Sequence, residues 1–149
     1  MIIASRYLGM VSVLQVKDYM SMSVLAVDQS ESVYDAADKM IKYNVGCIVV
    51  MQNKQVAGLL TKGDVIKRTL LAGLDAKKIA AEKIMSKPVV TISPEASLED
   101  AARLMVAKSV SKLPVMSDGS LVGIITSTDI LRIEPTQIHY LRGLLQPRK

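Results

Sequence analysis

Apolar and polar positions follow the same order twice along this chain. Residues 24–27 and 89–92 are short apolar runs, and their length and composition predict β-strands. After each run, apolar residues recur at helical spacing over residues 33–43 and 98–108. A serine followed three positions later by an acid precedes each helical pattern, which is typical of a helix start. Each half therefore begins with a strand and a helix.

The second part of each half predicts a hairpin followed by another helix. Short polar segments separate two apolar runs in each copy, which favours antiparallel pairs. The closing helices are expected to begin near Thr61 and near Thr126. The resulting order of strand, helix, strand, strand and helix predicts an α/β (or α+β) fold, with a small sheet covered on one face. The predicted hairpin strands are residues 46–51 with 55–60 and residues 111–116 with 120–125.

The two halves also align residue by residue. Residues 16–70 fall on residues 81–135 without a gap, and several polar and glycine positions are identical in both. A duplicated unit of this length is expected to pair its copies around a pseudo-twofold axis and to form two related clefts. We divide the chain into an N-terminal segment (1–15), repeat one (16–70), a linker (71–80), repeat two (81–135) and a C-terminal basic helix (136–149).

One repeated polar motif could carry chemistry. Gly58, Thr61 and Asp64 recur as Gly123, Thr126 and Asp129. A threonine at a helix start with an acid three residues later is a capping device. The same helix start could receive a phosphate, and the aspartate could accept both hydroxyls of a ribose. Capping and binding can coexist, and the spacing does not separate them.

Composition narrows the class of protein. Half of the 149 residues are apolar, with no Phe or Trp, so one domain with an aliphatic core is expected. A single Cys and a single His predict no disulfide, no metal site and no catalytic triad, so we expect neither an enzyme nor a required cofactor. Cys47 lies in an apolar run and is interpreted as a core residue. The N-terminal apolar runs are too short for a membrane span or a signal peptide, which predicts a cytoplasmic protein.

The net charge of +5 does not by itself decide whether the protein binds nucleic acid. A basic surface can attract nucleic acid, although a solvated, mildly basic surface explains the same excess. No RNA-binding sheet with exposed aromatic residues is indicated. The excess lies between the repeats and at the C-terminus, at Lys67, Arg68, Lys77, Lys78, Lys83, Lys87, Arg142, Arg148 and Lys149.

Taken together, the repeated Met-Ser, the Asp-Ala-Ala helix, the Lys112-Leu113-Pro114-Val115 run and the Gly-x-x-Thr-x-x-Asp motif resemble a tandem pair of CBS (cystathionine beta-synthase type) domains over residues 16–135. The resemblance implies two β-α-β-β-α units packed with pseudo-twofold symmetry. It also implies a regulatory module that binds AMP, ADP, ATP or S-adenosylmethionine between the repeats. A homodimer is expected through Val65, Ile66, Leu70, Ile130, Leu131 and Ile133, and a structural dimerisation module with vestigial sites is the alternative.

The resemblance also implies which residues form each site. Site one takes Thr126, Thr128 and Asp129 from repeat two and Met20, Leu25, Val45 and Gly46 from repeat one. Site two takes Thr61, Gly63 and Asp64 with Met85, Val90, Val110 and Ser111. Lys112 is expected to contact phosphate in site two, and its counterpart in repeat one is Cys47. Gly63 replaces the hydroxyl of Thr128, which suggests that site two is weaker or differently selective.

Overall fold

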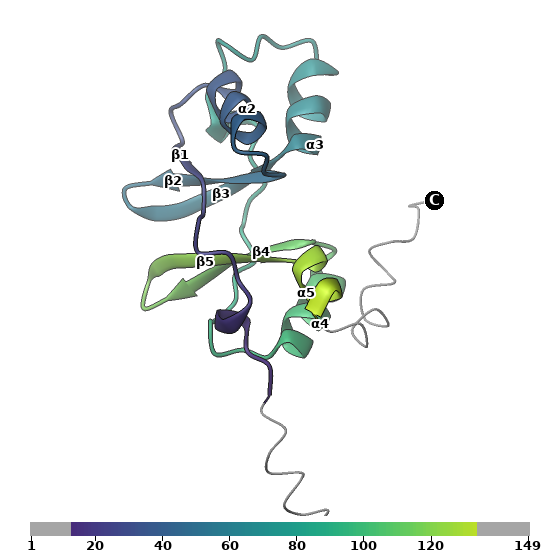
Figure 1. The fold of residues 1–149 in the computed structure, drawn as a ribbon. Helices are drawn as coiled ribbons and strands as arrows, with labels where there is room; N and C mark the ends of the chain where they lie inside the picture. The colour runs from purple at the N-terminus through teal and green to yellow at the C-terminus, as the bar shows by residue number, and fades with distance from the viewer. Residues whose placement is uncertain (1–12, 134–149) are drawn as a thin grey trace, which may run out of the picture.

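A computed structural model describes residues 13–133 and shows two sheets stacked face to face, with helices on their outer sides (Figure 1). The strands are β1 (Ala26–Asp28), β2 (Cys47–Gln52), β3 (Gln55–Thr61), β4 (Lys112–Ser117) and β5 (Ser120–Thr126). The helices are α2 (Val33–Lys42), α3 (Lys62–Val65), α4 (Leu98–Lys108) and α5 (Ser127–Ile133). Short helical turns lie at Val16–Asp18, Ile66–Leu70 and Ala81–Lys83. The predicted fold class is confirmed, whereas the C-terminal helix predicted over 136–149 lies outside the described residues.

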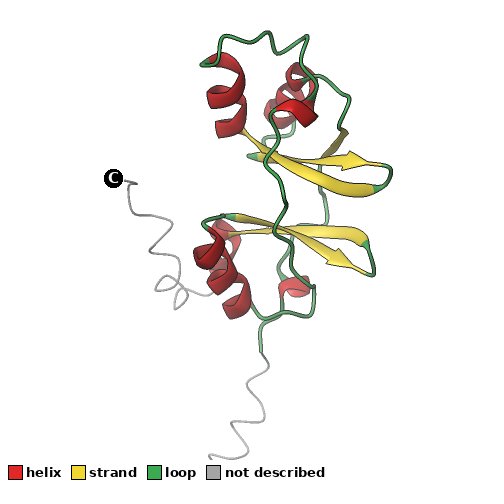
Figure 2. Ribbon diagram, turned by 180° about the vertical axis from the view of Figure 1, so that it is seen from behind, coloured by secondary structure: helices red, strands yellow, loops and turns green. Residues whose placement is uncertain are grey.

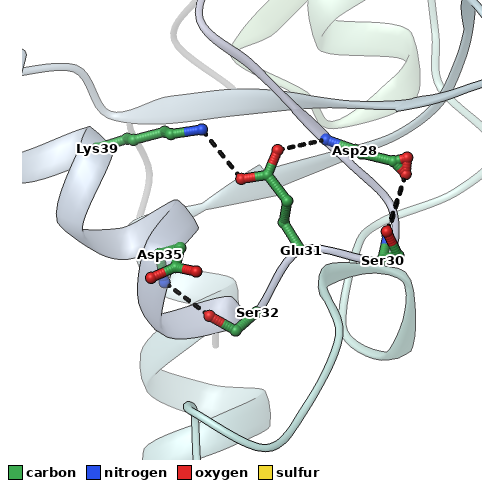
Figure 3. Close-up of polar contacts among 6 residues, drawn as sticks. All are labelled: Asp28, Ser30, Glu31, Ser32, Asp35 and Lys39. Atoms are coloured by element: carbon green, nitrogen blue, oxygen red, sulfur yellow. Dashed lines mark hydrogen bonds and ion pairs between the residues drawn. The ribbon is translucent and has the colours of Figure 1, made fainter.

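The serine caps predicted from the sequence begin both long helices. The Ser32 hydroxyl accepts the Asp35 N–H at 3.0 Å, and the Ser97 hydroxyl accepts the Asp100 N–H at 2.9 Å. Figure 3 shows Glu31 between β1 and α2, in contact with Asp28 of the strand and Lys39 of the helix. Its carboxylate accepts the Asp28 N–H at 3.1 Å and pairs with Lys39 at 3.0 Å. Local side-chain contacts therefore fix the turn between the first strand and the first helix of repeat one.

Both predicted hairpins form, and they share one geometry. β2 pairs antiparallel with β3, and β4 with β5, each with a register shift before the turn. The residues at the two turns have positive φ angles, at Asn53, Lys54, Asp118 and Gly119. This left-handed backbone matches the strand twist in a two-residue turn and suits Asn, Asp and Gly. The two hairpins lie one above the other in the view from behind (Figure 2).

The first strand forms in repeat one only. β1 pairs parallel with β2, and the Val49 N–H donates to the Leu25 carbonyl at 2.9 Å. The strand predicted over residues 89–92 is wrong, because only Ile92 bridges to Val115 there. Pro114 occupies the position equivalent to Val49 and has no N–H to donate. The missing donor shortens the ladder in repeat two to a single bridge.

The beginning of each repeat packs into the other half. Val16 is fully buried in the core formed by α4, β4, β5 and α5, whereas Ala81 and Ile84 are buried in the core under α2 and β2. Backbone hydrogen bonds repeat this exchange, from the Val16 N–H to the Ala96 carbonyl at 2.9 Å and from the Ala81 N–H to the Glu31 carbonyl at 2.8 Å. The two halves are therefore interlocked rather than simply joined by a linker.

Candidate functional site

Two clefts lie where the halves meet, and most of their walls are equivalent. The Asp129 cleft encloses about 280 Å³ and the Asp64 cleft about 360 Å³. The Asp129 cleft is lined by Ser21, Ser23, Val24, Leu25, Asn44, Val45, Gly46, Cys47, Val49, Lys112, Ile124, Thr126 and Asp129. The Asp64 cleft is lined by Leu59, Thr61, Asp64, Lys67, Arg68, Ser86, Ser109, Val110, Ser111 and Lys112.

The repeated Thr–Asp motif caps the closing helices. In repeat two, the Thr126 N–H donates to Oδ2 of Asp129 at 2.9 Å, and the Asp129 N–H donates to Oγ1 of Thr126 at 3.2 Å. Thr61 and Asp64 form the same reciprocal pair at 2.9 and 3.1 Å. The capping interpretation is therefore correct. It leaves Oδ1 of Asp129 without a hydrogen-bond donor among residues 13–133, so this oxygen can accept one from a ligand hydroxyl.

Asp64 is held more tightly than Asp129. The Ser86 hydroxyl lies 3.4 Å from both Asp64 carboxylate oxygens, and a guanidinium nitrogen of Arg68 lies 3.9 Å from Oδ1. Arg68 also donates to the Ile84 carbonyl at 2.9 Å, which orients its side chain in the cleft. The Asp64 cleft therefore carries an arginine that the Asp129 cleft lacks, since Ile133 is the equivalent residue.

Lys112 lines both clefts rather than site two alone. It lies at the start of β4, opposite Thr126 of β5. Its ammonium donates to the Ser111 hydroxyl at 3.3 Å in the Asp64 cleft. A Cβ atom at Gly46, in the Asp129 cleft, would lie 3.6 Å from its Cε atom. Within the described part of the chain, no carboxylate forms an ion pair with Lys112.

Cys47 is a wall of the Asp129 cleft and not purely a core residue. Burial raises the pKa of its thiol, and the positive charge of Lys112 offsets part of that increase. The thiol therefore stays protonated near neutral pH and presents a neutral, weakly polar surface.

Ten of the residues predicted from the resemblance line the expected cleft. In the Asp129 cleft these are Leu25, Val45, Gly46, Thr126 and Asp129. In the Asp64 cleft they are Thr61, Asp64, Val110, Ser111 and Lys112.

Five predicted residues line neither cleft. Thr128 and Gly63 are exposed on the first turns of α5 and α3. Met20 packs against Gly123, and Met85 packs against Gly58 beside a separate cavity. Val90 packs against the core of the second half. The expected difference between the two sites at Gly63 and Thr128 has no counterpart in the cleft linings and stays a prediction.

Several cleft residues were missed by the sequence analysis. Asn44 and Ser109 follow the first helix of each repeat. Their φ angles of 52° and 54° show the left-handed backbone conformation that commonly ends an α-helix. Ser21 and Ser86 are identical between the repeats and bridge to the opposite hairpin. The repetition of Ser21 as Ser86 and the polarity of both residues could have indicated that they line the clefts. Arg68 was considered only as part of a basic surface, because its contact with Ile84 joins distant parts of the sequence.

The structure also places residues of the predicted dimer face and of the predicted basic surface. Ile130, expected at a dimer face, is buried in the second core. Of the basic residues, Lys67 and Arg68 line the Asp64 cleft, and Lys77 lies over the Tyr34 ring at 4.8 Å. Over residues 13–133 no His, Cys, Asp or Glu cluster is arranged to hold a metal, and none of the helices there has the length and apolarity of a membrane span.

Comparison with known proteins identifies the family. The family model for the CBS domain matches residues 16–70 and 81–135. The chain therefore belongs to the CBS domain family and carries two of its domains.

The chain is similar to proteins of several organisms. A CBS domain-containing protein of Bacillus subtilis, YhcV, is 36% identical over 77% of this chain and 81% of its own length. An uncharacterized protein of Methanopyrus kandleri is 32% identical over 75% of this chain, which spans only 58% of that relative. A solved CBS domain pair, that of protein MJ0100 in complex with 5′-methylthioadenosine and S-adenosyl-L-methionine, superposes with a TM-score of 0.74. It is 28% identical over 85% of this chain and 99% of its own.

Proposed function

We propose that this member of the CBS family is a regulatory module that binds an adenosine-containing ligand, either AMP, ADP, ATP or S-adenosylmethionine, in its two clefts. The observation that carries the proposal is the repeated cleft itself. Each cleft combines a capping Thr–Asp pair from one repeat with residues of the other repeat, among them Val45 in the Asp129 cleft and Val110 in the Asp64 cleft. The complex of the similar MJ0100 pair with two adenosyl compounds supports the same ligand class.

The Asp129 cleft suits an adenosine nucleotide in three respects. Oδ1 of Asp129 can accept ribose hydroxyls while Oδ2 keeps its cap. Leu25, Val45 and Ile124 supply apolar walls for a flat base. Phosphate groups would rely on Lys112 more than on the start of α5. That helix is short, and its first turn already holds the negative charge of Asp129.

Ligand binding would act by changing how the halves pack. Each cleft takes residues from both repeats, so a ligand contacts both at once. It can shift the arrangement only if it binds one arrangement more tightly than another. A partner protein or a second copy of the chain would read that shift.

A homodimer is part of this proposal. Ile41, Ile66 and Leu70 are 71%, 50% and 71% exposed, and they lie on or just after α2 and α3. An apolar hollow of about 200 Å³ lies between these helices, lined by Ala37, Met40, Ile41, Lys62, Val65 and Ile66. Large exposed apolar patches on a small protein commonly mark an interface. Sedimentation equilibrium should give twice the monomer mass, and Ile66→Glu should give the monomer.

Thermal melting with AMP, ADP, ATP, S-adenosylmethionine, NAD and GTP tests the ligand class. A site filled at about 100 times its dissociation constant adds about 2.7 kcal/mol to the unfolding free energy. We expect the melting temperature to rise by several degrees with adenosine compounds and not with GTP. No change with any ligand would favour the structural module with vestigial sites. Polynucleotide binding that weakens steeply with salt would favour the nucleic-acid alternative.

A further inference from the structure

One lysine side chain lines two clefts in this protein. Among residues 13–133, Lys112 alone lines both the Asp129 cleft and the Asp64 cleft. Its ammonium now donates to Ser111 on one side, and its aliphatic chain passes Gly46 on the other. The equivalent position of repeat one is Cys47, so the approximate twofold symmetry supplies no second lysine.

The surroundings of Lys112 favour an anionic ligand. The side chain is partly buried, and its only hydrogen-bond partner among the described residues is the neutral Ser111 hydroxyl. A partly buried cation gains most from a neighbouring negative charge. No carboxylate of residues 13–133 pairs with it, so a ligand phosphate can take that place.

The formal charges of the two clefts differ. Lys67, Arg68 and Lys112 face one carboxylate, Asp64, in the Asp64 cleft. The Asp129 cleft contains Lys112 and Asp129, and its remaining lining residues are uncharged. When Lys112 is drawn to a phosphate in the Asp64 cleft, the Asp129 cleft retains only its carboxylate.

We propose that Lys112 couples the two clefts. Resting on the proposed function, this inference assigns nucleoside di- and triphosphates to the Asp64 cleft and adenosyl ligands with little or no phosphate charge to the Asp129 cleft. A polyphosphate in the Asp64 cleft engages Lys112 and disfavours a second phosphate in the Asp129 cleft. Linkage makes this antagonism reciprocal. A neutral nucleoside in the Asp129 cleft does not compete for the ammonium, so its affinity does not depend on whether the Asp64 cleft is filled.

Calorimetric titration with ADP and, separately, with adenosine tests the coupling. ADP should bind in two steps whose dissociation constants differ by about tenfold or more, within the usual range of such couplings. Asp64→Ala should remove the tight step and Asp129→Ala the weak one, which assigns each step to a cleft. Adenosine should bind the Asp129 cleft with the same affinity in the presence and absence of ADP at a concentration that fills only the tight step.

Three variants separate the role of Lys112 from general charge. Lys112→Met should weaken the tight ADP step by about tenfold and reduce the gap between the steps, while adenosine affinity is unchanged. Cys47→Lys gives the Asp129 cleft its own ammonium and should strengthen the weak step alone. Lys78→Met removes an exposed charge that lines neither cleft and should match the wild type. Two equal ADP steps, or an unchanged gap in Lys112→Met, would overturn the coupling. Absence of binding by both ligands would instead overturn the proposed function on which it rests.

Discussion

The sulfur atom of Met20 lies against Gly123 of β5. A Cβ atom at Gly123 would be 2.6 Å from that sulfur and 2.9 Å from the Ser21 carbonyl oxygen, which is closer than real Cβ contacts allow. Met85 covers Gly58 in the same way. The repeated Met-Ser pair and the repeated glycine are therefore two sides of one contact, through which each repeat closes on the hairpin of the other.

Gly123→Ala should destabilise the fold more than Gly58→Ala. The added methyl at Gly123 meets the Ser21 backbone, which cannot rotate away, and overpacking of this kind costs about 1–3 kcal/mol. At Gly58 the two closest atoms are Sδ and Cγ of Met85, which move away in another rotamer, and only the Met85 Cβ, at 3.0 Å, keeps its place. Urea denaturation of both variants measures the difference. An equal or larger loss in Gly58→Ala would show that the Ser21 contact is not the limiting one.

Val16→Ala should weaken the second half of the molecule, although Val16 begins the first repeat. Val16 is fully buried beside α4 and β5, and removal of two methyl groups from such a core costs about 2 kcal/mol. Hydrogen exchange should speed up in α4 before it does in α2. Val13→Ala, at a position 68% exposed, is the control and should change neither quantity. Loss of protection confined to α2 would contradict the interlocked cores.

Sequence patterns identified most elements because the local signals are strong here. The caps at Ser32 and Ser97, both hairpins and the starts of the closing helices at Thr61 and Thr126 all form as predicted. The strand over 89–92 was wrong because its partner Pro114, distant in sequence, lacks the required N–H. Composition could not reveal a pairing partner.

The candidate site was predictable where the repeat preserves both residue type and position. Thr61, Asp64, Thr126 and Asp129 line the clefts as expected. The resemblance placed Met20 and Met85 beside the base, because it gives positions in the sequence and not the directions of side chains. In the structure both side chains pack against a glycine. Lys112 lines both clefts because the start of β4 lies near Gly46 of the other repeat. The sequence does not show this contact, because it forms only when the two halves pack together.

Stability should depend on the ionisation of Glu31. Burial, the largest single influence, raises the pKa of this carboxyl, but the Asp28 N–H and Lys39 together outweigh it and hold the pKa below its ordinary value of 4.5. A depressed folded pKa gives stability that is present above about pH 4.5 and is lost as pH falls through the folded value. Glu31→Gln should therefore be less stable than wild type at pH 7 and equal to it near pH 2. A pH-independent difference in urea midpoint would contradict this.

Thr126 and Thr128 should differ in their effect on adenosine binding. Thr126 caps α5 and lines the Asp129 cleft, so Thr126→Val should cost about 0.5–2 kcal/mol of stability and weaken adenosine. Thr128 is exposed and lines neither cleft, so Thr128→Val should leave adenosine affinity unchanged. Equilibrium titration of both variants decides the matter. A large loss in Thr128→Val would mean that the cleft rearranges around its ligand.

Adenosine titration of the Asp64→Asn, Asp129→Asn double variant tests the central claim most directly. Asparagine keeps the size of the side chain and one oxygen for the cap, but it replaces the second acceptor with a donor. We predict that the wild type binds adenosine and not guanosine, and that the double variant loses at least about tenfold in affinity, or about 1.4 kcal/mol, without a matching loss of melting temperature. Unchanged adenosine affinity in the double variant, or no adenosine binding by the wild type, would contradict it.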